Sequence, residues 1–456
     1  MSPVTTCDVA VIGAGAAGLV AGHHLRREGH KVIIFEKQSQ VGGTWIYTNK
    51  TEPDSLSLDP NRPVTHSSLY LSLRTNLPRE VMGFKEYPFV VKKTGQRDER
   101  RFPGHGEVFE YLQDYGSEFG VYEMIRFDTE VIRVWRDGNG KWKVRSRKVK
   151  SGGEGVSEVF DAVVVCNGHY TEPRIAYIPG VDRWPGKQIH SHNYRVPEPY
   201  RNKVVILIGS SASAVDISRE IASVAKEVHI ASRSTSNEET ATLPGYDNIW
   251  LRPMMENAYE DGTISFPNGV KISADIILHC TGYKYHFPFL DTEGIVTVDD
   301  NRVGPLYKHV FPPSLAPWLS FVGLPWKVVP FPQFEFQSQW IAGTLSGRIS
   351  LPSPDEMTKD AEAFYSSLQS SGIPKRYTHN MDGIQAIYMA GLFLQFDYND
   401  WISTQCGSPK TEEWRKKMYS ATSLNRKARP ETYRDEWEDD DLVFEAYQDF
   451  AKKISK

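Results

Sequence analysis

Two stretches of the chain share one pattern of apolar and polar positions. In the first, a short apolar run at residues 8–12 leads into a glycine-rich turn and then a helical segment at 19–28. In the second, an apolar run at 204–208 leads into a similar turn, after which apolar residues recur at near-helical spacing over 215–224. A strand, a tight turn and a helix in this order are typical of a nucleotide-binding unit. The sequence therefore predicts two such units.

The first turn carries the complete glycine fingerprint of a dinucleotide site. A second apolar run, 31–35, ends in Glu36, which stands where a carboxylate hydrogen-bonds ribose hydroxyls. The first glycine permits the tight turn, the second lets the backbone approach a pyrophosphate, and the third lets the helix pack closely on the strand. A glycine-rich turn without a ligand is the alternative. The turn consists of Gly13, Ala14, Gly15, Ala16, Ala17 and Gly18.

A second glycine-rich segment favours FAD as the first nucleotide. Lys37 directly follows Glu36 and is predicted to be a cofactor-binding residue with it. Gly43, Thr44 and Trp45 come soon after. Adjacent glycines before a bulky aromatic suit a backbone that passes close to a flat cofactor, although a plain loop packed by the tryptophan would look the same. Further along, a predicted strand at 318–323 and a predicted helix at 334–345 form a pair that usually returns to the flavin in two-dinucleotide oxidoreductases.

The second turn departs from the fingerprint in its middle position. It reads Gly209, Ser210, Ser211, Ala212, Ser213 and Ala214, so a serine replaces the second glycine. Its side chain takes space at the phosphate, but its hydroxyl can donate a hydrogen bond there. The next strand ends in Ser232 and Arg233 with no carboxylate. An acid would repel a 2′-phosphate, whereas serine and arginine would bind one, so NADPH is expected rather than NADH.

Two other interpretations of this second unit are open. Arg233 would look the same as a solvated surface charge. The letters GSSAS also approach the G-x-S-x-G elbow of serine hydrolases, which needs an acid and a histidine later in the chain. Nothing singles out such partners, and a hydrolase leaves residues 8–45 unexplained.

The order of the motifs predicts an α/β protein in which one Rossmann-like domain is inserted into another. Residues 129–150 read as a β-hairpin, and an acidic run at 436–441 is interpreted as a solvated face. The expected domains are an FAD-binding first segment at 1–171, an NADPH-binding domain at 172–284, and a second FAD segment with a C-terminal helical region at 285–456.

Composition excludes several classes of function. The 456 residues include 57 acidic and 53 basic side chains, so there is no broad basic field for nucleic acid. The four cysteines form no C-x-x-C pair, which argues against a zinc ribbon, a disulfide scaffold or a dithiol centre. The first strand begins near Cys7, too early for a secretory leader, and no apolar run reaches the roughly 18 residues of a membrane span. We expect a cytoplasmic protein with a small-molecule partner.

Three further motifs resemble those of class B flavin-dependent monooxygenases. WPGKQIHSHNY at 184–194 resembles the signature FxGxxxHxxx(Y/F), and its final Tyr194 resembles the flavin-containing monooxygenases rather than the Baeyer–Villiger enzymes. CTGY at 280–283 resembles the A-T-G-Y linker. LRTNLPRE at 73–80 resembles the plant S-oxygenating branch, which includes S-alk(en)yl-cysteine and glucosinolate S-oxygenases.

Read without the resemblance, His190 and His192 could be a metal pair, but no third ligand is close in sequence, and no metal is expected. Asn76 alone would read as a turn residue before a proline. The resemblance instead makes Asn76 the catalytic residue, because in the family the stretch Thr75, Asn76 and Leu77 lies against flavin and nicotinamide.

The resemblance also implies the chemistry. NADPH would reduce FAD, O2 would add to give a flavin C4a-hydroperoxide, and retained NADP+ with Asn76 would protect it. A thioether sulfur would then take one oxygen atom and needs no general base, because it carries no proton. The favoured substrate is S-allyl-L-cysteine or a related S-alk(en)yl-L-cysteine. Methylthioalkyl glucosinolates and N-hydroxylation of an amine are the alternatives, and a non-catalytic flavin/NADPH redox sensor is the alternative from another class. No nucleic acid and no membrane anchor are expected.

Overall fold

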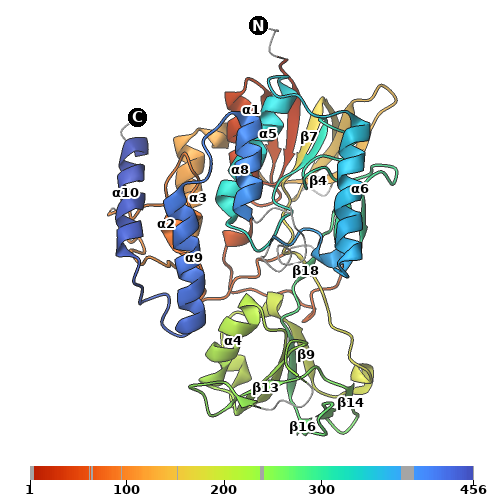
Figure 1. The fold of residues 1–456 in the computed structure, drawn as a ribbon. Coiled ribbons are helices and arrows are strands. Elements are labelled where there is room, and N and C mark those ends of the chain that lie inside the picture. The colour runs from red at the N-terminus through yellow and green to blue at the C-terminus, as the bar shows by residue number, and fades with distance from the viewer. Residues whose placement is uncertain are drawn as a thin grey trace. The chain divides into compact units, whose positions relative to one another are not determined.

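The chain forms two compact units (Figure 1). The computed structural model describes residues 5–60, 62, 65–93, 95–150, 153–236, 241–381 and 395–454. The first unit is built from Met1–Ile46, Arg74–Gly168 and Tyr285–Lys456, and the second from Tyr47–Leu73 and His169–Lys284.

A five-stranded parallel sheet is the centre of the first unit. Its central strand pairs in register on both sides, with Val9 opposite Val32 and opposite Ala162. This strand order is that of a Rossmann-like unit, in which a nucleotide binds at the carboxyl ends of the strands. The order is β21 (Leu319–Phe321), β7 (Ala162–Val165), β1 (Asp8–Ile12), β2 (Lys31–Phe35) and β3 (Ile125–Arg126).

Both faces of this sheet are covered, which explains why its strands read as continuous apolar runs. In β1, Val9 and Val11 belong to the buried cluster of the helices α1 (Ala16–Arg27) and α5 (Pro330–Leu345). The alternate residues Ala10 and Ile12 belong to a second cluster with the fully buried Trp142. That tryptophan begins the middle strand of an antiparallel sheet made of β4 (Thr129–Arg136), β5 (Trp142–Lys148) and β6 (Val156–Phe160). The predicted hairpin is confirmed in β4 and β5.

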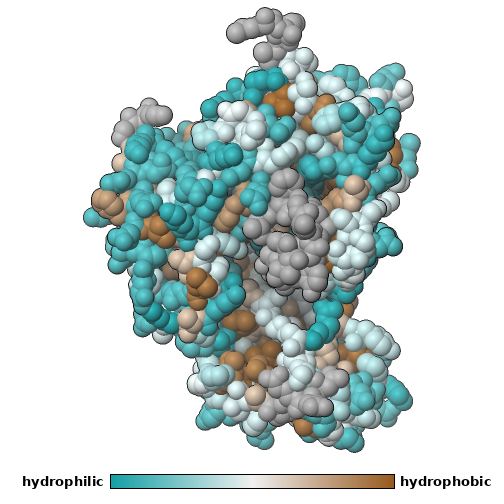
Figure 2. All heavy atoms as spheres, viewed as in Figure 1, coloured by the Kyte–Doolittle hydropathy of each residue, from teal (hydrophilic) through white to brown (hydrophobic). Residues whose placement is uncertain are grey.

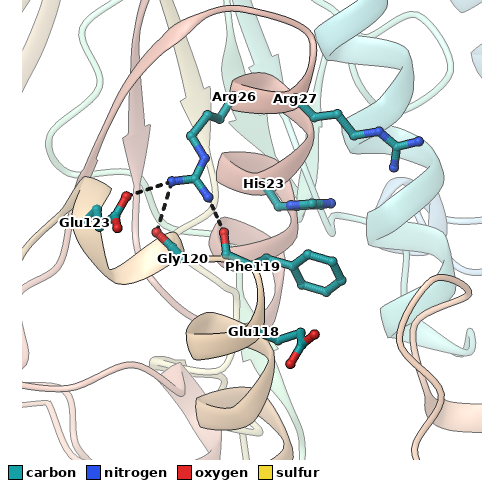
Figure 3. Close-up of a pocket in the computed structure, with 7 residues that line it drawn as sticks. All are labelled: His23, Arg26, Arg27, Glu118, Phe119, Gly120 and Glu123. Carbon is teal, nitrogen blue, oxygen red and sulfur yellow. Dashed lines mark hydrogen bonds and ion pairs between the residues drawn. The ribbon is translucent and has the colours of Figure 1, made fainter. Parts of the chain in front are cut away.

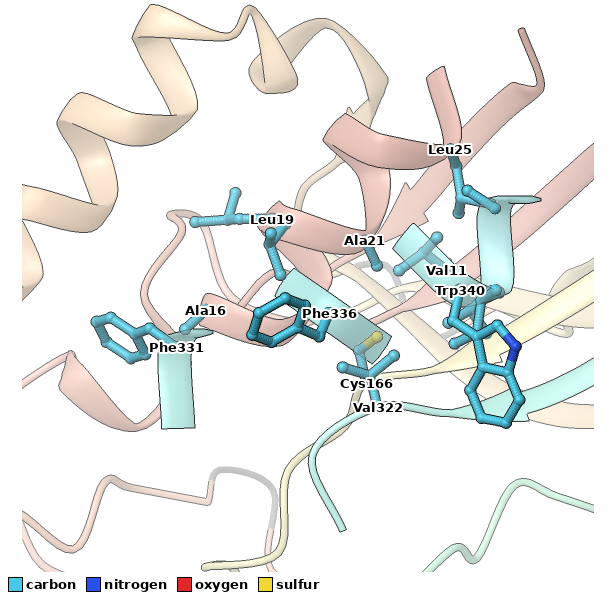
Figure 4. Packing of buried hydrophobic residues seen from close by; sticks show 14 of the residues in the cluster. Val11, Ala16, Leu19, Ala21, Leu25, Cys166, Val322, Phe331, Phe336 and Trp340 are labelled. Atoms are coloured by element: carbon cyan, nitrogen blue, oxygen red, sulfur yellow. The ribbon is translucent and has the colours of Figure 1, made fainter. Parts of the chain in front are cut away.

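The helices α1 and α5 pack together over the sheet. Figure 4 shows Phe331 and Phe336 of α5 next to Ala16 and Leu19 of α1, in one buried cluster. Both phenylalanines are only 1% exposed. Truncating a side chain buried this well typically costs about 3–5 kcal/mol, so this contact contributes strongly to holding α1 against α5.

The rest of the first unit is largely helical. A capping box of Ser353 and Glu356 starts the helix α6 (Pro354–Ser370). No helix in the described ranges is both long and apolar enough to span a membrane. The remaining elements are α2 (Arg79–Met82), α3 (His105–Glu118), β19 (Thr297–Asp299), β20 (Arg302–Gly304), α6 (Pro354–Ser370), α8 (Gln395–Cys406), α9 (Glu413–Ala428) and α10 (Asp440–Ile454).

The acidic run at 436–441 is only partly a solvated face, which corrects the sequence interpretation. Glu436 and Glu438 are exposed, and Figure 2 shows a mostly hydrophilic surface over α9 and α10. Asp439, however, has a side chain that is 9% exposed and lies 2.5 Å from the guanidinium of Arg101. A buried arginine needs such a partner, so the run includes one structural carboxylate.

The second unit repeats the architecture with a six-stranded sheet. Ile217 and Ile221 of α4 (Ala212–Ala222) pack on Val205 and Leu207 of its central strand. Neighbouring strands are parallel except for the first pair. The predicted α/β class with two Rossmann-like units is therefore confirmed. The order is β12 (Ala241–Thr242), β13 (Ile249–Arg252), β11 (Glu227–Ala231), β10 (Val204–Ile208), β17 (Ile276–His279) and β9 (Lys187–His190).

Smaller elements complete the second unit. Two short strands near the start and the end of the unit's longer segment pair with each other, so that Tyr283 lies opposite Pro173. A three-stranded antiparallel sheet packs below the larger one through Ile264, which is fully buried. These elements are β8 (Glu172–Pro173) with β18 (Tyr283–Lys284), and β14 (Asn257–Ala258), β15 (Thr263–Ser265) and β16 (Lys271–Ser273).

Residues 47–73 also belong to the second unit, whereas the sequence-based division assigned them to the first FAD segment. Side chains after β9 hold them there. Arg195 donates to the carbonyl oxygens of Thr48 (2.8 Å) and Ser67 (2.8 Å), and Asn193 donates to that of Asp54 (2.9 Å). The nucleotide that each unit binds stays a prediction.

Candidate functional site

The first glycine turn is shaped by two steric demands. Gly13 has φ +104°, and a Cβ there would lie 2.7 Å from the carbonyl oxygen of Cys166. A Cβ on Gly18 would lie 1.8 Å from the carbonyl oxygen of Gly13. Only glycine fits both positions, so α1 can begin directly against the turn. Its cap residue, Gly15, has no side chain, so the cap residue supplies no side-chain acceptor to the first N–H groups of α1.

Glu36 and the second glycine pair converge on this turn. The buried carboxylate of Glu36 accepts a hydrogen bond from the backbone N–H of Ala14 (2.7 Å) and another from that of Gln38 (2.7 Å). Burial raises the pKa of Glu36. The N–H of Gly42 donates to the carbonyl of Ala14 (3.1 Å), so the 42–45 loop is tied to the turn. Each oxygen of Glu36 keeps a lone pair with which to accept from a ribose hydroxyl.

Backbones also meet at this point. A Cβ on Gly43, which has φ +55°, would lie 2.9 Å from the Cα of Gly15. Thr44 is exposed, and Trp45 is half-buried with its ring edge-on to Phe331 at 6.4 Å. The turn, the loop and the start of α5 therefore lie together.

Three other predicted residues of the first site differ in their surroundings. Ala16 is buried under α5, and Ala17 is half-buried. The ammonium group of Lys37 lies 3.0 Å from the carboxylate of Glu130 on β4, so its charge is already paired.

Gln333 is a residue that the sequence analysis missed. It lies in the first turn of α5, which begins at Pro330 rather than at residue 334, because prolines are tolerated where helical N–H groups have no partner. Gln333 is 0% exposed, and within the described ranges neither atom of its carboxamide has a hydrogen-bond partner. One turn later, Gln337 accepts from the N–H of Gly323 (2.9 Å) and donates to the hydroxyl of Tyr398 (2.9 Å).

An unpaired buried carboxamide is costly, typically about 1–3 kcal/mol for each group left without a partner. This orphaned amide follows by two residues Phe331, whose ring meets that of Trp45, and it fits a flat ring that carries both hydrogen-bond donors and acceptors, as the flavin does. The residues present therefore fit FAD. No pattern in the sequence could have identified Gln333, because a glutamine in a helix is ordinary until its surroundings are known.

The loop with Thr75, Asn76 and Leu77 leads into α2 in the same unit. Thr75 is buried, and its hydroxyl donates to the carbonyl of Leu77 (2.8 Å). Leu77 packs on the clusters that contain Val329 and Phe331 at the start of α5. Asn76 is exposed, and no described residue pairs with its carboxamide. The backbone of this loop is fixed, while the amide is available to a ligand.

The second turn repeats the steric logic of the first. Gly209 has φ +121°, and a Cβ there would lie 2.5 Å from the carbonyl oxygen of Cys280. Ser211 is the cap residue of α4 but makes no side-chain cap. Among the described residues it has no histidine partner, which leaves the hydrolase interpretation without a base. Ala212 and Ser213 are exposed, and Ala214 is buried against the sheet.

Hydroxyl groups gather where β10 and β11 end. Ser232 donates to the hydroxyl of Ser210 (3.0 Å) and lies 2.7 Å from that of Ser234. Arg233 is exposed beside them. Hydroxyls, uncapped helix N–H groups and a guanidinium at one sheet edge suit a phosphate. The residues present therefore fit a nucleotide with a 2′-phosphate.

Of the residues that could be considered as metal ligands, His190 and Glu86 have other partners in the described residues. His190 uses both ring nitrogens, because it accepts from the N–H of His192 (3.1 Å) and contacts the carbonyl of Gly282 (3.1 Å). In the first unit, His23, His24 and Glu86 have ligand atoms within 4.8 Å of one another. Both carboxylate oxygens of Glu86, however, are 2.6 Å from Arg27.

A surface pocket of about 490 Å³ lies beside α1 and contains none of the predicted site residues (Figure 3). Its cations are already paired: Arg26 contacts Glu123 at 3.2 Å, and Arg27 contacts Glu86. Among the described residues that line it, neither arginine is left unpaired for a nucleotide phosphate. The candidate sites are therefore the two glycine turns and the Asn76 loop.

Comparisons with known proteins agree with this geometry. The model of the family described as flavin-binding monooxygenase-like matches residues 6–238 and 237–395. The flavin-containing monooxygenase FMO GS-OX-like 4 of Arabidopsis thaliana is 60% identical, over 99% of this chain and 98% of that protein. The structure of S-allyl-L-cysteine S-oxygenase from Allium sativum has a TM-score of 0.93 at 60% identity and covers 99% of this chain and 100% of that one.

A more distant structure shares the fold alone. Cyclohexanone monooxygenase from Rhodococcus sp. Phi1, solved bound to NADP+, has a TM-score of 0.59 at 15% identity and covers 89% of this chain and 97% of that one. The family match spans most of the chain, and the two 60% relatives span nearly all of it. The chain therefore belongs to the flavin-binding monooxygenase-like family and is a flavin-containing monooxygenase.

Proposed function

We propose that this enzyme uses FAD, NADPH and O2 to convert a small thioether into its sulfoxide, with S-allyl-L-cysteine or a related S-alk(en)yl-L-cysteine as substrate. The observation that carries the proposal is the similarity to the Allium sativum S-allyl-L-cysteine S-oxygenase, 60% identical with a TM-score of 0.93. The overall reaction consumes one thioether, one O2, one NADPH and one proton, and yields one sulfoxide, one water and one NADP+.

FAD would be held by the first unit. Glu36 would accept from ribose hydroxyls, and the uncapped start of α1 after Gly15 would face the pyrophosphate. Gln333 would pair with the ring, and Trp45 would pack near it. When bound and reduced, FAD supplies the activation of O2 that no side chain can provide.

NADPH would be held by the second unit. The start of α4 after Ser211 would bind the pyrophosphate, while Ser232 and Arg233 would bind the 2′-phosphate. A guanidinium and hydroxyls discriminate by charge, because NADH offers them no phosphate.

The chain's own contribution to the chemistry is positioning and exclusion of water. The sulfur carries no proton, so no side chain has to act as a base. Asn76 is proposed as the catalytic residue, because a neutral amide can donate one hydrogen bond and accept another without a change of charge. Its carboxamide has no partner within the described residues, as this role requires.

The substrate proposal is tested by comparing kcat/KM for S-allyl-L-cysteine, a methylthioalkyl glucosinolate and a tertiary amine, with product identified by mass spectrometry. We expect sulfoxide from S-allyl-L-cysteine with the highest kcat/KM. A higher value for the glucosinolate would assign the enzyme to the second candidate, which the plant-type stretch at 73–80 supports. N-oxide as the main product would contradict both thioether assignments.

A further inference from the structure

The segment 433–439, between α9 and α10, lies on the loop that carries Asn76. The Nε–H of Arg434 donates to the carbonyl oxygen of Thr75 at 3.0 Å. The guanidinium of Arg74 binds both carboxylate oxygens of Asp435, at 2.8 and 3.0 Å. It also donates to the carbonyl of Arg434 at 3.2 Å. These hydrogen bonds join Arg74 and Thr75 to Asp435 and Arg434, which lie more than 350 positions away along the chain.

A more deeply buried set of contacts holds the segment 433–439 against residues that come after the Asn76 loop in the chain. Asp439 receives two hydrogen bonds from Arg101, at 2.5 and 2.9 Å, and Arg101 also contacts Glu80 of α2 at 3.4 Å. The side chains of all three are less than one-tenth exposed. Trp437 lies over the Arg101 guanidinium at 4.9 Å. The pairing of Arg101 with Asp439 is buried and uses two hydrogen bonds. It therefore holds the segment 433–439 in one position against the Asn76 loop.

The loop itself is held from its other side by residues 101–103. The N–H of Thr75 donates to the carbonyl of Pro103 at 2.9 Å, and the N–H of Arg79 donates to that of Arg101 at 2.9 Å. Asn76 stands between these fixed points, and its carboxamide pairs with no described residue. The direction of the Asn76 side chain is therefore set by the backbone of the loop. The carbonyl group of the preceding residue, Thr75, is the one that accepts the hydrogen bond from Arg434.

We propose that the segment 433–439 positions Asn76, with Arg434 and Asp435 as positioning residues for oxygen transfer. The proposal rests on the proposed function, in which Asn76 touches the reacting groups. If these contacts are removed, the Asn76 amide can move away from the reacting groups. NADPH, O2 and a proton then give NADP+ and H2O2 without oxygen transfer, a side reaction called the leak below. Because a misplacement of about 1 Å can cost on the order of 100-fold in a reaction, a partial loosening should raise this leak by about threefold to tenfold.

The exposure of the pair makes the test clean. Asp435 is 62% exposed on its side chain, so its charge contributes little to global stability. The variants are Asp435→Asn and Arg434→Leu. The matched control is Glu438→Gln in the same segment, which breaks the exposed pair with Arg429, while no described contact joins Glu438 to the Asn76 loop.

The experiment measures H2O2 formed per NADPH without substrate, per bound flavin, in the holoenzyme, together with FAD content and Tm. Hydrogen exchange of peptides covering 74–82 is measured on the same proteins. We expect both variants to raise the leak and to speed exchange in these peptides, and the control to do neither. Arg434→Leu should add nothing to the leak of Asn76→Ala, because both act through one amide.

Three results would overturn the inference while leaving the proposed function intact. The first is an unchanged leak in Asp435→Asn and Arg434→Leu while Asn76→Ala raises it. The second is faster exchange only within 433–439. The third is an Arg434→Leu effect that adds fully to that of Asn76→Ala, which would indicate a general structural role. If Asn76→Ala itself leaves the leak unchanged, the catalytic assignment in the proposed function fails, and the inference fails with it.

Discussion

Replacing Gln333 by leucine should change the stability of the apoprotein and its affinity for FAD in opposite directions. The side chain is fully buried in α5, and neither atom of its carboxamide is paired with a described residue. Leucine has nearly the same volume and no polar atoms. The substitution therefore removes an unsatisfied group without creating a cavity.

The magnitudes follow from the missing partners. Each orphaned polar group costs about 1–3 kcal/mol, so Gln333→Leu should stabilise the apoprotein by at least about 1 kcal/mol. If FAD supplies the partners, two hydrogen bonds are lost on binding, each worth about 0.5–1.5 kcal/mol. The Kd for FAD should then rise by about 5-fold to 150-fold.

The assay is urea unfolding of the apoprotein combined with FAD titration followed by flavin fluorescence. Gln337→Leu is the matched control, one turn along the same helix but paired to Gly323 and Tyr398. It should destabilise the apoprotein by about 1–3 kcal/mol, because the N–H of Gly323 loses its acceptor. A less stable Gln333→Leu apoprotein with unchanged FAD affinity would show that Gln333 does not pair with the flavin ring.

Three further predictions concern other parts of the protein. Gly18→Ala places a Cβ 1.8 Å from the carbonyl oxygen of Gly13. It should therefore lower both the FAD content and the Tm, with a loss of about 1–3 kcal/mol in the free energy of unfolding. A variant that is fully flavinated and equally stable would contradict the turn geometry. Arg233→Gln should raise KM for NADPH by about 10-fold to 100-fold and leave KM for NADH unchanged, and steady-state kinetics with both cofactors checks this. Burial, followed by repulsion from Glu86, raises the pKa of Glu335 to about 8. The folded state then holds one proton more than the unfolded state between about pH 4.5 and 8, so stability falls as pH rises at about 1.4 kcal/mol per unit. Relative to the parent enzyme, Glu335→Gln should gain about 2 kcal/mol between about pH 6 and 8 in urea unfolding, and a constant difference would show that Glu335 does not titrate there.

The strands and turns could be predicted from sequence because their determinants are local. Strand β1 is buried on both faces, so it reads as one apolar run, and its turn needs glycine at positions that only glycine can occupy. The second turn repeats this at Gly209, whose backbone meets the carbonyl of Cys280 as Gly13 meets that of Cys166. Such features leave a mark in a short window of residues.

The missed features depend on contacts between distant residues. Residues 47–73 join the second unit through Asn193 and Arg195, more than 100 positions away. Asp439 is structural only because Arg101 is buried beneath it. Gln333 is informative only because nothing described pairs with it. Neither periodicity nor composition records such pairings, so no reading of the chain in short windows could have found them.

The most direct test of the account is to supply the purified holoenzyme with NADPH, S-allyl-L-cysteine and O2 labelled with oxygen-18, and to analyse the product by mass spectrometry. We expect a sulfoxide that carries one labelled oxygen atom, formed in a one-to-one ratio with NADPH consumed, with the second labelled atom in water. NADPH consumption that yields only labelled H2O2, with the thioether unchanged, would contradict it.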